Sequence, residues 1–233
     1  MNAKLNFIQN IDLIHNNLDH AYYELTKSAP SYFRIAVEVH NVLLRSMVEV
    51  LKGTANSFVV RGLMNRTKQM YFTIGSGPQI MIQKEKVENC NHAWRFSKPE
   101  TVGEIENHSN DKRFEGSSND YLVGFYDLLA MIQCDYFMEY FSQTTTIIIN
   151  DEDLHTLDWL HEMIRNRYEH FVPQSYGAPI IDLIESSLLC LEICTKLLVE
   201  PTFIHAMHDD EKIKEVINNI SVKLRERLPE KDN

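Results

Sequence analysis

The sequence lacks any run of 18 apolar residues, and no apolar segment follows its start at Met1. Neither a membrane-spanning helix nor a secretory signal peptide is therefore predicted, and we expect a soluble, cytoplasmic protein with no membrane partner. Its four cysteines form no Cys-x-x-Cys pair. Cys190 and Cys194 stand four residues apart in an apolar stretch, which is typical of core thiols in a reducing compartment.

Several sequence motifs of nucleotide-binding, nucleophilic and metal sites are also missing. There is no phosphate-binding Walker loop, no dinucleotide-binding glycine pattern and no nucleophile elbow. The segment His161–Arg165 departs from the zinc-protease pattern because Arg165 stands where the second histidine is needed. His205, His208 and Asp209 could hold a metal in principle, but the remaining ligands are not evident, and such residues usually cap a helix. We predict no metal and no cofactor.

Positive charge is scarce overall but concentrated in one segment. The chain carries a net charge of −10 over 233 residues, which argues against indiscriminate nucleic-acid binding. Residues 57–99 nevertheless hold seven bases against Glu85 and Glu88; the bases are Arg61, Arg66, Lys68, Lys84, Lys86, Arg95 and Lys98. Such a segment could attract a polyanion locally, or its bases could simply solvate a polar insertion.

Apolar residues at helical spacing predict an all-α fold, a bundle of about six helices. The predicted helices cover 3–26, 31–52, 119–141, the stretch from 151 to the residues before Pro173, 180–200 and 209–228. Residues 54–118 differ: Tyr71–Ile74 and Gln79–Gln83 flank a glycine-rich turn and predict a β-hairpin, and Lys98–Ser118 reads as a loop. This β-hairpin and loop insertion separates the second helix from the third.

The most informative stretch is Arg165-Asn166-Arg167-Tyr168-Glu169-His170, at the end of the fourth predicted helix. Asn150 or Asp151 can cap the start of that helix, and Pro173 forces its end. The simplest interpretation is a solvated helix end in which Arg165 pairs with Glu169. On a straight helix Arg165 lies about 140° from His170, so a joint site requires either a bend or two facing copies of the motif.

The Arg165-Asn166-x-x-x-His170 pattern resembles the Arg-x(4–6)-His motif of HEPN domains (higher eukaryotes and prokaryotes nucleotide-binding). The resemblance covers residues 119–200 best and extends to 1–53, so 1–233 is expected to be one HEPN-like domain with 54–118 inserted. It implies an all-helical bundle, a homodimer in which two motifs meet, and metal-independent RNA cleavage that leaves a 2′,3′-cyclic phosphate and a 5′-hydroxyl.

Residue types in the motif suit that chemistry. A histidine can exchange protons near neutral pH, and an arginine can donate two parallel hydrogen bonds to phosphate oxygens. We therefore assign catalysis to Arg165 and His170, supported by Asn166, which could orient the imidazole or contact the phosphate. Arg167 and Tyr168, which lie between Asn166 and His170 in the sequence, are the candidate substrate-binding residues.

Three alternatives stay open. A toxin or phage-defence effector with a cognate antitoxin or regulator is one setting, but Val172 stands where HEPN toxins controlled by nucleotidyl transfer carry a modified tyrosine. A non-catalytic HEPN bundle that binds a nucleotide or a protein partner is the competing class. His40, with Glu38, Asn41 and Arg45 on the second helix, is expected on the solvent side, or else His40 helps to line a site.

Overall fold

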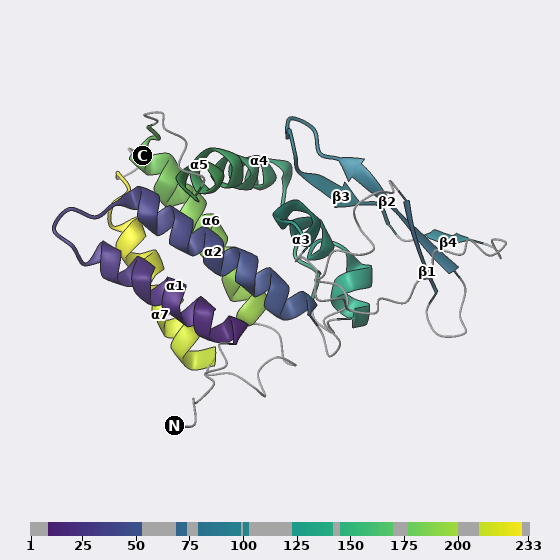
Figure 1. The fold of residues 1–233 in the computed structure, drawn as a ribbon, viewed down its shortest axis with the longest axis horizontal. Helices are drawn as coiled ribbons and strands as arrows, with labels where there is room; N and C mark the ends of the chain where they lie inside the picture. The colour runs from purple at the N-terminus through teal and green to yellow at the C-terminus, as the bar shows by residue number, and fades with distance from the viewer. Residues whose placement is uncertain are drawn as a thin grey trace, which may run out of the picture. The chain divides into compact units, whose positions relative to one another are not determined.

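The computed structural model describes residues 9–52, 69–73, 79–98, 100–102, 123–141, 145–169, 177–199 and 210–229. The chain divides into two compact units. The terminal unit comprises Met1–Glu49 and Thr156–Asn233, and the central unit comprises Val50–His155. Described residues are mostly helical, with one small antiparallel sheet, as the sequence predicts (Figure 1). Over these residues no helix is long and apolar enough to cross a membrane.

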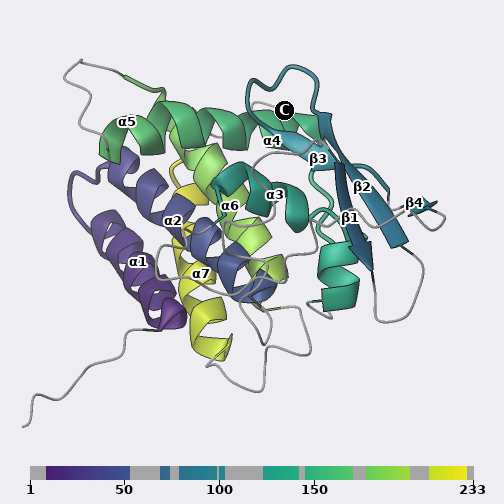
Figure 2. The same ribbon diagram turned by 45° about the vertical axis from the view of Figure 1, so that its right-hand side comes forward.

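Four long helices build the terminal unit: α1 (Asn10–Leu25), α2 (Tyr32–Leu51), α6 (Ile180–Leu198) and α7 (Asp210–Arg225). They lie side by side in both views (Figures 1 and 2). Helix α7 is highly charged, yet Ile213, Ile217, Ile220 and Leu224 are all buried along one stripe. An isolated helix of this length is marginal in water, so it is this buried stripe that holds α7 in place.

Polar contacts fix how α1 lies along α2. Asn10 donates to the Arg45 carbonyl at 2.9 Å and to the Glu49 carboxylate at 3.0 Å. Arg45 donates in turn to the Asn17 amide oxygen at 3.2 Å, and Asn17 donates to Glu38. Because each pair joins a fixed position on α1 to a fixed position on α2, sliding one helix by a turn would break all of them. Glu38 and Arg45 are thus helix-joining residues.

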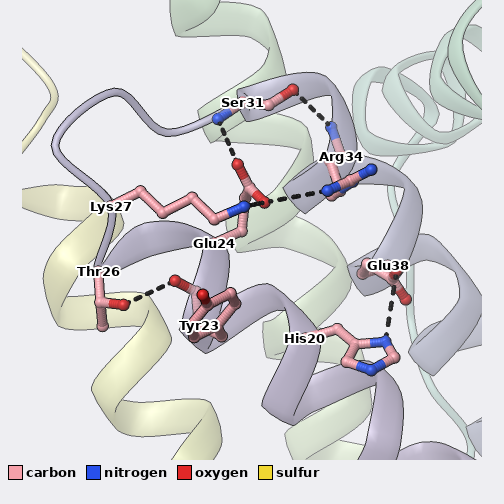
Figure 3. Close-up of polar contacts among 8 residues, drawn as sticks. All are labelled: His20, Tyr23, Glu24, Thr26, Lys27, Ser31, Arg34 and Glu38. Carbon is pink, nitrogen blue, oxygen red and sulfur yellow. Dashed lines mark hydrogen bonds and ion pairs between the residues drawn. The ribbon is translucent and has the colours of Figure 1, made fainter.

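The connection from α1 to α2 is tied down by one buried carboxylate. Glu24 is 4% exposed and accepts from Lys27 Nζ at 2.6 Å, from the Ser31 backbone N–H at 3.0 Å and from Arg34 at 3.5 Å (Figure 3). The hydrogen bond from Lys27, followed by that from Ser31, lowers the pKa of Glu24. Glu24 therefore remains ionised at neutral pH, as a buried acceptor surrounded by donors should.

The core of α6 contains the two thiols that the sequence places there. Cys190 and Cys194 are both buried, which confirms them as core residues. Burial raises the pKa of Cys190, and it raises the pKa of Cys194 to about 12. Both stay protonated at neutral pH and behave as small apolar side chains.

The central unit contains the sheet, with strands β1 (Gln69–Thr73), β2 (Gln79–Lys86), β3 (Trp94–Phe96) and β4 (Glu100–Val102). The predicted hairpin is confirmed: β1 and β2 are antiparallel, with Thr73 opposite Gln79. Strands β3 and β4 were not predicted, and β4 falls inside the stretch expected to be a loop. Both pair with β2, β3 through Lys84–Lys86 and β4 through Gln79–Met81.

The third predicted helix is interrupted. It forms α3 (Phe125–Met131) and, after a turn, the π-helix η1 (Tyr136–Phe141). The Ile132 carbonyl accepts from the backbone N–H of Ile147 at 2.9 Å. In a continuous α-helix that carbonyl would accept from residue 136. The incoming segment 145–150 thus takes over a helix hydrogen bond, which periodicity within 119–141 cannot reveal.

Candidate functional site

The motif lies on a helix made of three consecutive parts: α4 (Asp151–Trp159), the π-helix η2 (Leu160–Arg165) and α5 (Asn166–Glu169). Asn150 caps it as predicted, since its side-chain oxygen accepts from the Asp153 N–H at 2.8 Å. The predicted apolar stripe is buried: Leu154, Leu157, Leu160 and Ile164. This stripe fixes which side of the helix end faces away from the core.

The motif begins on the last residue of a π turn, since η2 ends at Arg165. In η2 the backbone N–H of Asn166 donates to the His161 carbonyl, five residues earlier. Residues five apart are thereby brought over one another, whereas an α-helix brings together residues four apart. His161, Arg165 and Asn166 consequently share one widened turn. Such turns are frequent at functional sites.

Arg165 and Asn166 form a direct pair. A terminal nitrogen of the Arg165 guanidinium donates to the Asn166 side-chain oxygen at 2.9 Å. The Arg165 Nε is buried, and the side chain as a whole is half-buried. Asn166 therefore orients the guanidinium. Arg165 is thus not the fully solvated side chain of the simplest interpretation: it is half-buried, and its neighbour Ile164 belongs to the core.

The remaining motif residues are described to different extents. Arg167 is half-buried on α5. Tyr168 and Glu169 are helical in backbone, and His170 lies outside the described residues. The approach of Arg165 to His170 therefore stays a prediction, as does the substrate-binding role of Arg167 and Tyr168.

The fourth side chain of the site is His40, a residue expected on the solvent side of α2. His40 on α2 is 0% exposed, and its Nε2 lies 3.0 Å from Nδ1 of His161, a hydrogen-bonding distance. The two rings stack with centroids 5.0 Å apart and an interplanar angle of 30°. The expectation that His40 faces solvent is wrong, because His40 follows Ala36 and precedes Leu43 and Met47 on the apolar stripe of α2.

The electrostatics of this pair follow from burial. Desolvation is the main cause that lowers the pKa of His40 well below its ordinary value, and the nearby His161 and Arg165 lower it further. His40 is therefore neutral at pH 7. His161 is the more accessible partner: 12% of its side chain is exposed, and its Nε2 lies 4.0 Å from the Glu162 carboxylate. His161, Arg165 and Asn166 thus lie on one helical turn, and His40 on α2 contacts His161.

The bases of the segment 57–99 that the structure describes fall into two groups, paired and exposed. In the central unit Lys84 pairs with Asp127 at 2.9 Å and lies 3.8 Å from the centroid of the Trp94 ring. Arg95 donates to Asp151 and to the Ile149 carbonyl. Both bases hold strands β2 and β3 to the segments around them. Lys86 and Lys98 are exposed, and Arg61, Arg66 and Lys68 lie outside the described residues.

In the described ranges no three His, Cys, Asp or Glu side chains come together as metal ligands, and His205, His208 and Asp209 lie outside those ranges. A depression of about 580 Å³ on α7 is lined by Glu211, Lys212, Lys214, Glu215 and Asn218. It includes none of the motif residues and mixes both signs of charge.

Comparison of the chain with protein-family models, with curated proteins and with solved structures gave no match. The resemblance to HEPN domains therefore rests on the Arg165–His170 motif and its helical setting.

Proposed function

We propose that the chain is a metal-independent endoribonuclease of the HEPN type. The observation that carries this proposal is the preorganised guanidinium of Arg165, which is held by Asn166 at 2.9 Å on the helical turn that also carries His161, the partner of the buried His40. A fixed arginine in a partly desolvated setting is suited to stabilise charge that develops on a phosphate. A solvated arginine with no role would gain nothing from a buried Nε and a neighbouring amide.

The reaction uses the nucleophile that RNA itself carries. The 2′-hydroxyl attacks the adjacent phosphorus, the 2′-oxygen–phosphorus bond forms, and the bond from phosphorus to the 5′-oxygen breaks. One proton leaves the 2′-hydroxyl and one proton joins the departing 5′-oxygen. Arg165 contacts the non-bridging oxygens, and His170 transfers one of these protons. The products are a 2′,3′-cyclic phosphate and a 5′-hydroxyl.

Three further parts of the proposal concern the RNA contacts, the assembly of two chains and the cellular setting. Arg167 and Tyr168 contact the RNA strand beside the cleaved bond. Two copies of the chain form a homodimer that brings two motifs together. A toxin or phage-defence role, held in check by a cognate antitoxin or regulator, is the cellular setting that such an activity would suit. Lys84 and Arg95 are paired within the central unit, so these two bases are less available for phosphate contacts.

The test is cleavage of mixed single-stranded RNA in the presence of EDTA by the full chain. We expect His170→Ala and Arg165→Ala each to lose at least about 100-fold in rate, the scale of a positioned proton-transfer group or charge stabiliser. Arg165→Lys should also be impaired, because it keeps the charge but loses the paired donors. Direct phosphorylation of the new 5′ ends by a polynucleotide kinase identifies 5′-hydroxyl products.

Matched controls separate chemistry from folding. His155→Ala and Arg225→Ala remove the same residue types from exposed positions and should cut as fast as wild type. Arg165 is half-buried, so its alanine variant is also expected to lower the free energy of unfolding by about 1 kcal/mol, and thermal melts must accompany the rates. Intact RNA after incubation with wild type, or full activity in His170→Ala, would show that the nuclease proposal is wrong. An intact-RNA result would favour a bundle that binds a nucleotide or protein.

A further inference from the structure

The pair of His40 and His161 joins residues 121 positions apart and takes no part in the motif. His40 is 0% exposed within α2, where a polar ring is costly unless it is hydrogen-bonded. His161 supplies a partner through its Nδ1 at 3.0 Å. The other ring nitrogen of His161, Nε2, lies on the side of Glu162, and 12% of the His161 side chain reaches solvent. The pair therefore has a buried end and an accessible end.

The protonation of the pair follows from its geometry. If the pair takes up a proton, both nitrogens of the protonated ring become donors, so the other ring must accept. His40 is the fully buried ring, and its charged form is disfavoured first by desolvation and then by the nearby positive charges. The added proton therefore resides on His161. Nδ1–H of His161 then donates to Nε2 of His40, and Nε2–H of His161 is the donor at the accessible end.

We propose that His161 is a second catalytic histidine of this site, the general acid that protonates the leaving 5′-oxygen, and that His40 is the residue that positions it. This inference rests on the proposed ribonuclease function. It is carried by the shared turn: the His161 carbonyl accepts the backbone N–H of Asn166, and Asn166 holds Arg165. A phosphate bound by Arg165 would thus lie one widened helical turn from His161.

The proposal accounts for both protons of the reaction. His170 takes the proton of the 2′-hydroxyl as the 2′-oxygen–phosphorus bond forms. His161 gives its Nε2 proton to the 5′-oxygen as the phosphorus–oxygen bond breaks, and its ring becomes neutral while His40 still accepts from Nδ1. Exchange with water then restores both histidines. One chain in this way offers a base and an acid, where the motif alone offers a single histidine.

The experiment compares two RNAs of the same sequence with wild type, His161→Ala and the exposed control His155→Ala. One RNA is unmodified, and the other carries a 5′-bridging sulfur at the linkage that wild type cuts. The thiolate that leaves from this linkage needs no proton. We expect His161→Ala to lose at least about 100-fold on the unmodified RNA. On the sulfur-containing RNA we expect its rate to come within about tenfold of wild type, because only the acid is missing.

His40 is tested by two substitutions that differ in one property. His40→Phe fills the same space but cannot accept from Nδ1 of His161, and we expect a loss of about 10- to 100-fold on unmodified RNA. His40→Gln offers an amide oxygen at that place and should recover part of the rate. The pH profile is a second readout: the fall in rate at high pH, where the acid loses its proton, should disappear in His161→Ala and shift in His40→Phe.

The outcomes are distinct. If wild type cuts neither RNA, the proposed function fails and this inference fails with it. If wild type cuts and His161→Ala cuts unmodified RNA equally fast, or loses the same factor on both RNAs, His161 is not the acid while the ribonuclease proposal stands. Should His161→Ala not fold in a thermal melt, His161→Gln, which keeps a hydrogen bond to His40, is judged by the same criteria.

Discussion

Replacing Glu24 tests how the α1–α2 connection is held. Glu24 is 4% exposed, and its carboxylate accepts three donors, among them the Ser31 backbone N–H at 3.0 Å (Figure 3). In Glu24→Ala this N–H loses its acceptor, which costs about 1–3 kcal/mol. Lys27 and Arg34 are 36% and 53% exposed, so solvent screens them and each ion pair adds about 0–1 kcal/mol. Together these contributions span about 1–5 kcal/mol, and we expect a loss near the middle of that span, about 2–4 kcal/mol, in the free energy of unfolding.

The measurement is urea unfolding followed by circular dichroism at neutral pH. A loss of this size lowers the melting temperature by roughly 5–15 °C for a chain of this length. Glu24→Gln keeps an oxygen for Ser31 and should lose only about 1 kcal/mol. Asp19→Ala, an exposed carboxylate on α1, is the matched control and should stay within about 0.5 kcal/mol of wild type. The reasoning is refuted if Glu24→Gln costs as much as Glu24→Ala, or if both are neutral.

The lowered pKa of Glu24 also predicts whether its contribution to the free energy of unfolding rises or falls with pH. Its pKa in the folded chain is lowered from the ordinary 4.5, chiefly by the hydrogen bond from Lys27. The unfolded chain therefore takes up a proton first as the pH falls. The advantage of wild type over Glu24→Gln should be complete above the unfolded pKa and should disappear as the pH falls through the lower, folded pKa. An advantage that grows on acidification would contradict this assignment.

Two further predictions concern assembly and the buried histidine. Sedimentation at micromolar concentration should give about twice the 27.2 kDa of one chain, and a monomer throughout would count against the proposed dimer. The pKa of His40 is lowered by burial, then by His161 and Arg165, so stability should be complete above about pH 6.5 and fall below it by up to about 1.4 kcal/mol per pH unit. His40→Phe should flatten that slope in urea titrations between about pH 5 and 7, the range around the ordinary histidine pKa. An unchanged slope would rule out His40 as its source.

Local patterns were sufficient for most elements of the fold. The 3.6-residue period predicts the long helices because each buries one stripe, and Asn150 is identifiable as a cap because its oxygen serves the N–H three residues on. The hairpin of β1 and β2 follows from two strand-like runs around a glycine-rich turn. These signals all lie within a few residues of the structure that they specify.

Features that depend on distant partners were missed. The helix predicted over 119–141 breaks because Ile147 takes the carbonyl of Ile132, and β4 forms because β2 offers it an edge. The contact of His40 with His161 is also long-range, but its burial had a local signal. His40 keeps the spacing of Ala36, Leu43 and Met47, so it occupies an apolar stripe. A polar residue at such a position is expected to have a buried partner.

The π turn over Leu160–Arg165 changes the direction in which the side chains after it point around the helix axis. A π turn amounts to an α-helix that carries one surplus residue, so everything after it is rotated by about 100° from the phase set by α4. A single helical wheel drawn through 151–169 therefore misplaces either the apolar stripe or the motif. Deleting one residue within the turn would restore a uniform phase. It would leave Leu154 and Leu157 buried while swinging Asn166 and the residues after it to another face of the helix.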